Sequence, residues 1–251
     1  MQLENTSAIV TGGASGLGAA TALALAEEGA QVFAIDLQPS IDQAPAVDGV
    51  TYVAADVTDE EQVRAAVALA AEAAPLRTVV NCAGIGPSAR ILGRKGVHDL
   101  GLYAKIVQIN LVGSFTVLAL ASEAIAQTEP DENGQRGVIV NTASIAAYDG
   151  HIGQVAYASS KGGIVGMTLP AARDLAQYGI RVCTIAPGIV NTPMLATVSE
   201  EFRAGLAAGV PFPQRLCSPA EYAQLVTMVV DHDYLNGETI RMDGALRMAP
   251  R

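Results

Sequence analysis

The sequence predicts an α/β fold in which one domain is built on a doubly wound parallel sheet of seven strands, with helices on both faces. Short β-branched runs alternate with long alanine-rich stretches along all 251 residues. The β-branched runs are nearly continuous in apolar residues, as expected for strands covered on both faces. Neither a repeat nor an obvious linker divides the chain, and its length is normal for a single α/β unit. Strand, helix and strand in this order predict a parallel sheet.

Seven strands and five helices are expected along the chain. The strands are 7–11, 31–36, 51–55, 78–81, 138–143 and 180–186, with a seventh at 238–244. The helices are at about 16–28, 59–74, 100–127, 153–177 and 219–231. Two irregular segments interrupt this order, at 84–101 and 187–219. Ligands bind beyond the carboxyl ends of the strands in such sheets, so both segments are expected on the ligand side. Long irregular segments are usually functional, and 187–219 is expected to cover the substrate.

The overall charge makes several classes of partner unfavourable. The net charge is -10 and the pI is about 4.7, so nucleic acid and anionic membrane surfaces are not expected as partners. Half of the residues are apolar, which is enough to bury a large core. The most apolar stretch, 106–122, is interrupted by Gln108, Asn110 and Ser114, so we do not expect it to span a membrane.

The cysteines and histidines are few and scattered. Cys82, Cys183 and Cys217 show no pairing or CxxC spacing, so we expect buried thiols in a reducing, cytoplasmic compartment. The three histidines do not cluster either, and no metal site is expected.

A glycine-rich turn follows the first strand. The residues TGGASGLG, 11–18, open a helix, and Gly12, Gly16 and Gly18 have TGxxxGxG spacing. Glycines permit a tight turn that brings backbone N–H groups against a diphosphate, and the helix N-terminus adds its positive dipole end. Packing turns also use glycines, but the position between a first strand and a helix indicates a Rossmann-type dinucleotide site.

Asp36 ends the second strand, where its carboxylate can accept hydrogen bonds from both hydroxyls of an adenosine ribose. The carboxylate would also repel a 2′-phosphate, and no basic residue beside it offsets this effect. The cofactor expected is therefore NAD rather than NADP. The alternative interpretation is a solvated aspartate at a strand end.

A tyrosine and a lysine in QVAYASSKGG suggest the chemistry. Tyr157 and Lys161 are four residues apart in an expected helix, so they share one face. An ammonium nearby favours the phenolate and lowers the pKa of the tyrosine, which can then exchange a proton with a substrate oxygen. The spacing alone also arises by chance.

Two polar residues support this pair. Ser144 ends the fifth strand, where its hydroxyl can bond the reacting oxygen, although it also fits a turn or cap. Asn110 is polar within an apolar helical run. It fits either a satisfied core amide or one end of a water bridge towards Lys161.

Together these motifs resemble the short-chain dehydrogenase/reductase family. TGGASGLG, NCAG (81–84), Asn110, Ser144 and the Tyr157–Lys161 pair occur in the family's order from residue 6 to about 244. NCAG departs by one residue from the more usual NNAG. The resemblance implies Tyr157 as catalytic acid/base, Lys161 as the group bonding the nicotinamide ribose, Ser144 as orienter of the substrate and Asn110 as relay.

The C-terminal half also resembles one branch of the family, the type II 3-hydroxyacyl-CoA dehydrogenases. The segments that carry this resemblance include YASSKGGIVGMTLPAARDLA, IRVCTIAPG and LNGETIRMDGALRM. By position, the branch implies cofactor contacts at Ser15, Leu17, Asp56, Val57, Cys82, Val190 and Thr192. The resemblance also places Asn81, Ala83, Gly84, Pro187 and Gly188 in the cofactor site, with Tyr157 and Lys161.

The function expected is NAD-dependent interconversion of 3-hydroxyacyl-CoA and 3-oxoacyl-CoA, a fatty-acid β-oxidation type of step. A secondary-alcohol or hydroxysteroid dehydrogenase would use the same machinery. A non-catalytic scaffold subunit is a third possibility, which the intact Ser144, Tyr157 and Lys161 oppose. The resemblance further implies a homotetramer in which the tail ALRMAPR lies against a neighbour. Small residues on the helix 153–177 fit such close packing.

An acyl-CoA carries phosphate charges that an acidic protein must meet with a local cationic rim. The candidates are Arg90, Arg94, Lys95, Arg203 and Arg215. An apolar slot for the acyl chain is expected in the 187–219 segment. Its candidate residues are Ile189, Val190, Met194, Leu195, Phe202, Leu206 and Phe212.

Overall fold

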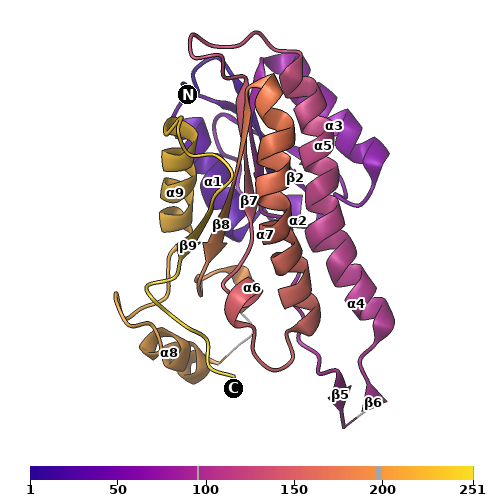
Figure 1. The fold of residues 1–251 in the computed structure, drawn as a ribbon, viewed down its shortest axis with the longest axis vertical. Coiled ribbons are helices and arrows are strands. Elements are labelled where there is room, and N and C mark those ends of the chain that lie inside the picture. The colour runs from indigo at the N-terminus through magenta and orange to yellow at the C-terminus, as the bar shows by residue number, and fades with distance from the viewer. Residues whose placement is uncertain (95, 196–198, 251) are drawn as a thin grey trace.

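A computed structural model describes the chain at residues 1–94, 96–195 and 199–250. Its centre is a seven-stranded sheet in which every neighbouring pair is parallel, with the strand order β3-β2-β1-β4-β7-β8-β9 (Figure 1). The strands are β1 (Ser7–Thr11), β2 (Gln31–Asp36), β3 (Val50–Ala54), β4 (Leu76–Asn81), β7 (Gly137–Thr142), β8 (Ile180–Pro187) and β9 (Thr239–Met242). The doubly wound parallel sheet predicted from the sequence is confirmed, with strand ends displaced by at most two residues.

Helices cover both faces of the sheet and enclose two apolar cores. The helices α1 (Gly16–Glu27) and α9 (Pro219–Asp231) lie on one face (Figure 1). The other face carries α3 (Glu60–Ala73), α5 (Ser114–Ala126) and α7 (Val155–Leu175). Successive strand residues point to opposite faces, so in β1 Ile9 joins the core under α3 and α5, while Ala8 and Val10 join the core under α1 and α9. All three are fully buried.

The helical stretch expected at 100–127 is divided into three parts. It consists of α4 (Leu100–Val107), a π-helical turn η1 (Gln108–Gly113) and α5. Between residues 100 and 126 the stretch is long and apolar enough to cross a membrane by composition alone, with a mean hydropathy of 1.6. Its inner side, however, belongs to the core of the domain, where Val117, Ala121 and Ile125 are completely buried.

Several shorter elements were not expected from the sequence. They are α2 (Gln38–Ile41), the hairpin of β5 (Leu92–Gly93) and β6 (Gly96–Val97), α6 (Ala146–Asp149), η2 (Ala176–Tyr178), η3 (Pro193–Leu195) and α8 (Glu200–Ala208). The segment 187–219 is therefore not simply an irregular loop. Ser199 caps α8 by accepting a hydrogen bond from the Phe202 backbone N–H, and two glutamates in the first turn suit the helix dipole.

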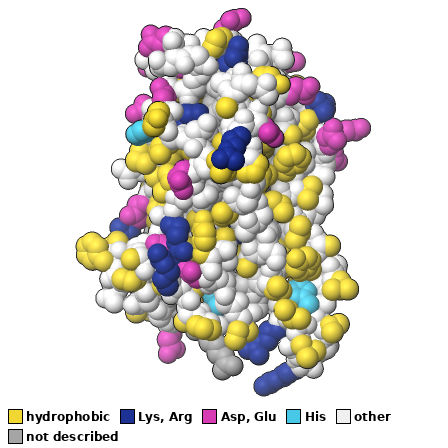
Figure 2. Space-filling view, in the orientation of Figure 1, with side chains coloured by type: hydrophobic (Ala, Val, Ile, Leu, Met, Phe, Trp, Pro, Cys, Tyr) yellow, Lys and Arg dark blue, Asp and Glu magenta, His cyan; other side chains and the backbone are white. Residues whose placement is uncertain are grey.

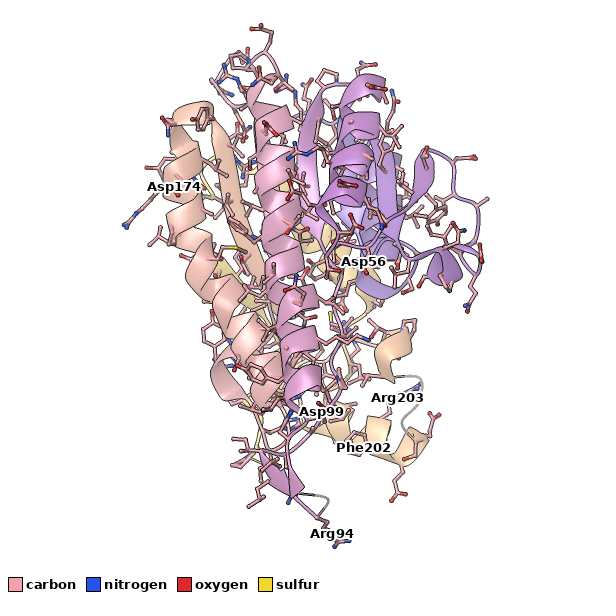
Figure 3. The ribbon with its side chains drawn as sticks, turned by 90° about the vertical axis from the view of Figure 1, so that its right-hand side faces the viewer. Asp56, Arg94, Asp99, Asp174, Phe202 and Arg203 are labelled. Carbon is pink, nitrogen blue, oxygen red and sulfur yellow. The ribbon has the colours of Figure 1, made fainter. Side chains whose placement is uncertain are left out.

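The carboxyl ends of the strands form one edge of the sheet, where the ligand side was expected. The chain runs outward from β1 to β3 and then crosses over to β4, so β1 and β4 flank the point where the strand order reverses. Beyond this edge lie α6, α8 and the C-terminal segment (Figure 1). Figure 3 shows Phe202 and Arg203 of α8 below the strand ends, with Asp56 near the edge itself.

Candidate active site

The turn after β1 has a backbone that side chains would not fit. Gly12 and Gly16 have φ angles of +64° and +54°, a region that L-residues rarely adopt. A Cβ on Gly12 would lie 2.9 Å from the Ala83 backbone nitrogen, and one on Gly18 would collide with the Gly12 carbonyl oxygen. Ser15 is the N-cap of α1, whose first turn carries no carboxylate. This cradle of backbone at a helix N-terminus fits a diphosphate group.

Asp36 joins the second strand to this turn. Its carboxylate accepts hydrogen bonds from the Ala14 N–H at 3.1 Å and the Leu37 N–H at 2.8 Å. The first basic residue of the chain is Arg64, so neither β2 nor the segment after it contributes a cation. The arrangement places a partly exposed negative charge beside the cradle.

The turn after β4 is fixed by a buried polar network. The Thr11 hydroxyl accepts hydrogen bonds from the backbone N–H groups of Cys82 and Ala83, both at 3.2 Å. Asn81 is buried, and its amide donates to Asn141 Oδ1 at 2.9 Å and to the Ser114 carbonyl at 3.3 Å. The Asn81 side chain therefore supports the turn from within.

The other expected cofactor residues lie around the same edge. Val57 is buried against Gly113, and Asp56 accepts hydrogen bonds from the backbone and hydroxyl of Thr58. Leu17 packs beside the core under α1. A Cβ on Gly84 would lie 3.7 Å from the Lys161 Nζ, so this glycine leaves room next to the amine.

The segment after β8 returns towards the glycine turn. Pro187 accepts a hydrogen bond from the Ile145 N–H at 3.0 Å, and a Cβ on Gly188 would lie 2.9 Å from the Asp243 Cα. Val190 is buried and pairs with Cys217. At the end of this segment, Thr192 is 3.5 Å from the position of a Cβ on Gly16. The segments that follow the first and sixth predicted strands therefore approach each other at the ligand side of the sheet.

Tyr157 and Lys161 lie on one face of α7, as their spacing predicted. Lys161 is 5% exposed, and its Nζ lies 5.8 Å from the centre of the half-buried Tyr157 ring. The amine donates a hydrogen bond to the Thr142 carbonyl at 2.7 Å. Ser144 is buried two residues after β7, and its hydroxyl accepts a hydrogen bond from the Ala146 N–H at 3.1 Å.

Burial controls the ionisation of both groups. It lowers the pKa of Lys161 to about 8 and raises the pKa of Tyr157 above its ordinary value. The hydrogen bond between Tyr157 and Ser144 opposes the rise in the tyrosine pKa. The sequence led us to expect that Lys161 would lower the tyrosine pKa below 10. That expectation is wrong for the protein alone, because burying the phenolate raises the pKa of Tyr157 more than the hydrogen bond with Ser144 lowers it.

Asn110 lies within the π-helical turn, a local irregularity that is frequent at functional sites. Its Oδ1 accepts a hydrogen bond from the Ile85 N–H at 2.8 Å, and its Nδ2 donates to the Ile85 carbonyl at 2.9 Å and to the Ser160 hydroxyl at 3.0 Å. The amide thus braces the turn after β4 against α7. Its role as a relay towards Lys161 stays a prediction.

Three residues at the site were not identified from the sequence. Thr11 and Thr142 hold the turn after β4 and the Lys161 amine, respectively. Tyr222, on α9, is fully buried, and its hydroxyl is 2.6 Å from the Thr142 hydroxyl. The sequence carries a weak signal for these residues, since a hydroxyl group in an apolar strand or helix needs a partner.

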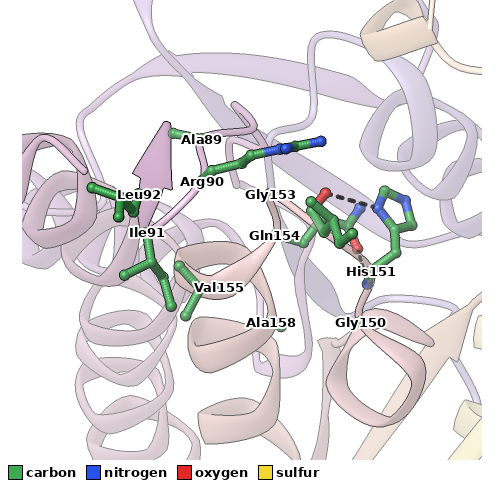
Figure 4. A pocket seen from close by; sticks show the side chains of 11 residues that line it. Ala89, Arg90, Ile91, Leu92, Gly150, His151, Gly153, Gln154, Val155 and Ala158 are labelled. Carbon is green, nitrogen blue, oxygen red and sulfur yellow. Dashed lines mark hydrogen bonds between the residues drawn. The ribbon is translucent and has the colours of Figure 1, made fainter. Parts of the chain in front are cut away.

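A pocket of about 450 Å³ opens beside the start of α7. Figure 4 shows Ile91, Leu92 and Val155 on one side of it, with Arg90 and His151 across from them. A second pocket of about 410 Å³ lies between α8 and residues 215–218. It is lined by Arg203 and Arg215 among others.

The basic and apolar residues expected around the substrate are not all brought together. Arg90 lines the first pocket, whereas Arg94 lies at the tip of the hairpin (Figure 3). Arg215 is paired with Glu221 at 2.7 Å, and Lys95 lies outside the described residues. The described residues of 187–219 do not form the expected apolar slot. Phe202 and Phe212 are exposed to solvent, and the side chain of Met194 is not among those described.

The comparisons with known proteins identify the family. The model of the family described as short chain dehydrogenase matches residues 6–202. The chain belongs to the short-chain dehydrogenase family. It is an oxidoreductase of that family, whose members use a nicotinamide cofactor, and the glycine cradle fits the diphosphate of such a cofactor.

Three similar proteins carry the same name. A protein of Drosophila melanogaster, 3-hydroxyacyl-CoA dehydrogenase type-2, is 50% identical over 99% of this chain and 100% of its own length. Its namesake from Bos taurus is 49% identical over 97% of this chain and 95% of its own length. The crystal structure of a 3-hydroxyacyl-CoA dehydrogenase type-2 from Mycobacterium avium is 43% identical, with a TM-score of 0.93 over 100% of this chain and 99% of that one.

Among the residues described, no group of three histidine, cysteine or acidic side chains could hold a metal ion.

Proposed function

We propose that this short-chain dehydrogenase interconverts 3-hydroxyacyl-CoA and 3-oxoacyl-CoA with NAD as cofactor, as in β-oxidation of fatty acids. The observation that supports this substrate class is the 49–50% identity, over nearly the whole chain, to proteins named 3-hydroxyacyl-CoA dehydrogenase type-2. The matched region covers 97–99% of this chain and so includes the segments that contain Ser144, Tyr157 and the residues after β8.

The proposed catalytic residues have complementary roles. In the oxidation, Tyr157 takes the proton of the C3 hydroxyl as hydride leaves C3, and the nicotinamide supplies the acceptor for that hydride. The Ser144 hydroxyl holds the reacting oxygen beside the phenol. It also stabilises the phenolate, since its hydrogen bond with Tyr157 lowers the tyrosine pKa. Lys161, held by the Thr142 carbonyl, is placed to bond the nicotinamide ribose and to bring a positive charge to the site.

The choice of NAD is supported by the charge around the cradle. The Asp36 carboxylate, beside the cradle, would repel a 2′-phosphate, and no basic residue precedes Arg64 in the sequence. Asp36→Ala should weaken NAD binding and raise the ratio of NADP to NAD use. Asp48→Ala, which changes an exposed carboxylate in the same part of the chain, is the control. A wild type that already prefers NADP contradicts the proposal.

The pocket beside α7 supports an acyl-CoA as substrate. Its wall of Ile91, Leu92 and Val155 suits an acyl chain, and Arg90 offers a cation to the phosphates of CoA. The segment 187–219, through α8, would cover the substrate.

We further infer a homotetramer, because Gly162 and Gly166 have nothing within 4 Å of an added Cβ and so leave α7 open to a close neighbour.

The exposed surface supports this assembly. Phe115 of α5 is 54% exposed and Leu169 of α7 is 44% exposed. Figure 2 shows hydrophobic side chains and few charged ones over the middle of α5 and α7. The C-terminal segment also packs on its own chain, through Leu246 and through the Pro250 carbonyl, which accepts from the Ile152 N–H.

The acidic surface and the half-buried or buried thiols fit a cytoplasmic protein that binds neither nucleic acid nor membrane.

A secondary-alcohol or hydroxysteroid dehydrogenase is the second candidate function, favoured by the same apolar pocket wall. The deciding experiment compares kcat/KM for 3-oxoacyl-CoAs of several lengths, a 17β-hydroxysteroid and simple secondary alcohols at two salt concentrations. We expect thioesters to be preferred, with rates that fall as salt screens the attraction of CoA to Arg90. A steroid or free alcohol that exceeds every thioester contradicts the acyl-CoA proposal. Absence of turnover with any of them favours a scaffold.

A further inference from the structure

The direction of the Ser144 hydroxyl depends on α6, the short helix that follows it. Ser144 Oγ accepts from the Ala146 N–H at 3.1 Å, and the Ser144 carbonyl accepts from the Ala147 N–H at 3.0 Å. This helix has only four residues, Ala146–Asp149, and a single turn is unstable without contacts from outside it. The contacts at the C-terminal end of α6 therefore influence the orientation of the Ser144 side chain.

Arg241 of β9 holds that far end. Its Nη2 lies 2.6 Å from Asp149 Oδ2, the last residue of α6, and its Nε donates to Asp243 Oδ2 at 2.8 Å. The guanidinium also donates to the Leu246 carbonyl at 3.3 Å and lies 5.0 Å from the centre of the Tyr148 ring. Arg241 and Asp149 are only 22% and 21% exposed, so this pair is less screened by water than a surface ion pair.

Apolar contacts join the same three segments. Ile145, the residue after Ser144, packs with Val210 beyond α8 and Leu246 of the C-terminal segment. Gly244 permits this approach, because it has a φ of +58° and a Cβ there would lie 2.6 Å from Val210. The C-terminal segment thus lies against α6 on both its apolar and its charged side.

We propose that Arg241 and Asp149 form a positioning pair that sets the Ser144 hydroxyl against Tyr157 and the reacting oxygen. This inference rests on the roles proposed above for Ser144 and Tyr157. Ser144 stands at the start of α6 and Asp149 at its end, so a loosened end lets the short helix and the serine turn together. The hydroxyl would then meet the reacting oxygen less often, while the cofactor cradle at β1 would be unaffected.

The first test compares Arg241→Gln with two other variants. Arg241→Gln should lower kcat by about tenfold, since small misplacements in an active site are costly, and should leave KM for NAD nearly unchanged. Arg241→Lys, which keeps a cation beside Asp149, should recover part of kcat. Arg247→Gln is the matched control, because Arg247 also pairs with Asp243, at 3.0 Å, but is 61% exposed and bonds Asp243 and the Leu246 carbonyl rather than Asp149. The control should keep the wild-type kcat.

The decisive measurement repeats Arg241→Gln in the Ser144→Ala background. If Arg241 acts through Ser144, the second substitution adds almost nothing to the loss in kcat that Ser144→Ala causes alone. Losses that multiply, or an Arg241→Gln variant with wild-type kcat, overturn the proposal. Should Arg241→Gln fail to fold, as thermal unfolding would show, the nearly isosteric Asp149→Asn carries the same comparison. The assay uses any alcohol that the wild type oxidises, so failure of the acyl-CoA proposal alone leaves this test intact.

Discussion

The turn after β1 and the polar cluster after β7 lie at the same edge of the sheet but are built in opposite ways. The turn works through the absence of side chains, because a Cβ on Gly12 or Gly18 would strike backbone atoms. The cluster works through polar side chains that are taken out of water, with Lys161 5% exposed and Ser144 9% exposed. Substitutions in the turn should therefore damage the fold and the cradle, whereas substitutions in the cluster should damage turnover and leave the fold intact.

The largest effect that separates the two regions is expected from Tyr157→Phe. The substitution keeps the half-buried ring and removes only the hydroxyl that exchanges the proton. Loss of a general acid–base lowers kcat by about 10²–10⁴-fold. Cofactor affinity and thermal unfolding should change little. Tyr178→Phe, at an exposed tyrosine in η2, is the control, and near-full turnover of Tyr157→Phe would show that the phenol is not the proton-transfer group.

Gly18→Ala tests the turn itself. The added Cβ would meet the Gly12 carbonyl oxygen, so the backbone must shift and the free energy of unfolding should fall by about 1–3 kcal/mol. NAD affinity should fall with it, because the cradle widens. Gly205→Ala in α8 is the control, since an added Cβ there has open space and should be neutral or stabilising by about 0.5–1 kcal/mol. Urea unfolding measures both, and equal stability of Gly18→Ala and the wild type would refute the argument.

Lys161→Met should both stabilise the protein against unfolding and abolish its turnover. Burial lowers the pKa of Lys161 to about 8, so the charged amine is a cost to the folded state at pH 7. Removing it should raise the free energy of unfolding by about 1–3 kcal/mol at that pH. This cost to the folded state disappears as the pH rises through a defined window. Between about 8 and 10.5 the unfolded chain binds the proton that the folded chain has released, so wild-type stability rises with pH there.

The measurement is urea unfolding of the protein without cofactor from pH 7 to 10. The gap between Lys161→Met and the wild type should narrow as the pH rises through this window. Lys105→Met, at an exposed lysine of α4, should show no such trend. A variant that is less stable than the wild type at pH 7 would mean that the hydrogen bond to Thr142 outweighs the cost of burying the charge.

The sequence predicted the parts of the site that depend on local spacing. The four-residue separation of Tyr157 and Lys161 needs only a helix, and the glycine spacing needs only a turn, so both were predicted correctly. It did not predict the segment 187–219, where α8 is capped by Ser199 and leaves Phe202 exposed. Nor did it predict the tyrosine pKa, because the balance between burial and charge depends on packing that the sequence order does not reveal. Partners from distant segments, such as Tyr222 and Arg241, were missed for the same reason.

The smallest effect is expected where the two regions are joined. Tyr222 belongs to α9, which packs beside α1 under the glycine turn, yet its hydroxyl crosses to Thr142, whose carbonyl holds Lys161. Tyr222→Phe removes the buried hydrogen bond of 2.6 Å to Thr142 and the longer one, of 3.8 Å, that Cys82 Sγ donates. The Thr142 hydroxyl then keeps its contact with the Cys82 sulfur, 3.6 Å away. The free energy of unfolding should therefore fall by about 0.5–1.5 kcal/mol.

Turnover of Tyr222→Phe should fall only a few-fold, because the Thr142 backbone carbonyl, not its hydroxyl, bonds Lys161. Tyr52→Phe is the control, since its hydroxyl donates to the Pro45 carbonyl at an exposed position where water can replace the bond. Unfolding in urea and kcat are measured on both variants. If Tyr222→Phe lost as much turnover as Tyr157→Phe without losing stability, the hydroxyl of Tyr222 would have to act in the proton transfer. The chemically active cluster would then include a residue of α9, which lies on the face of the sheet opposite α7.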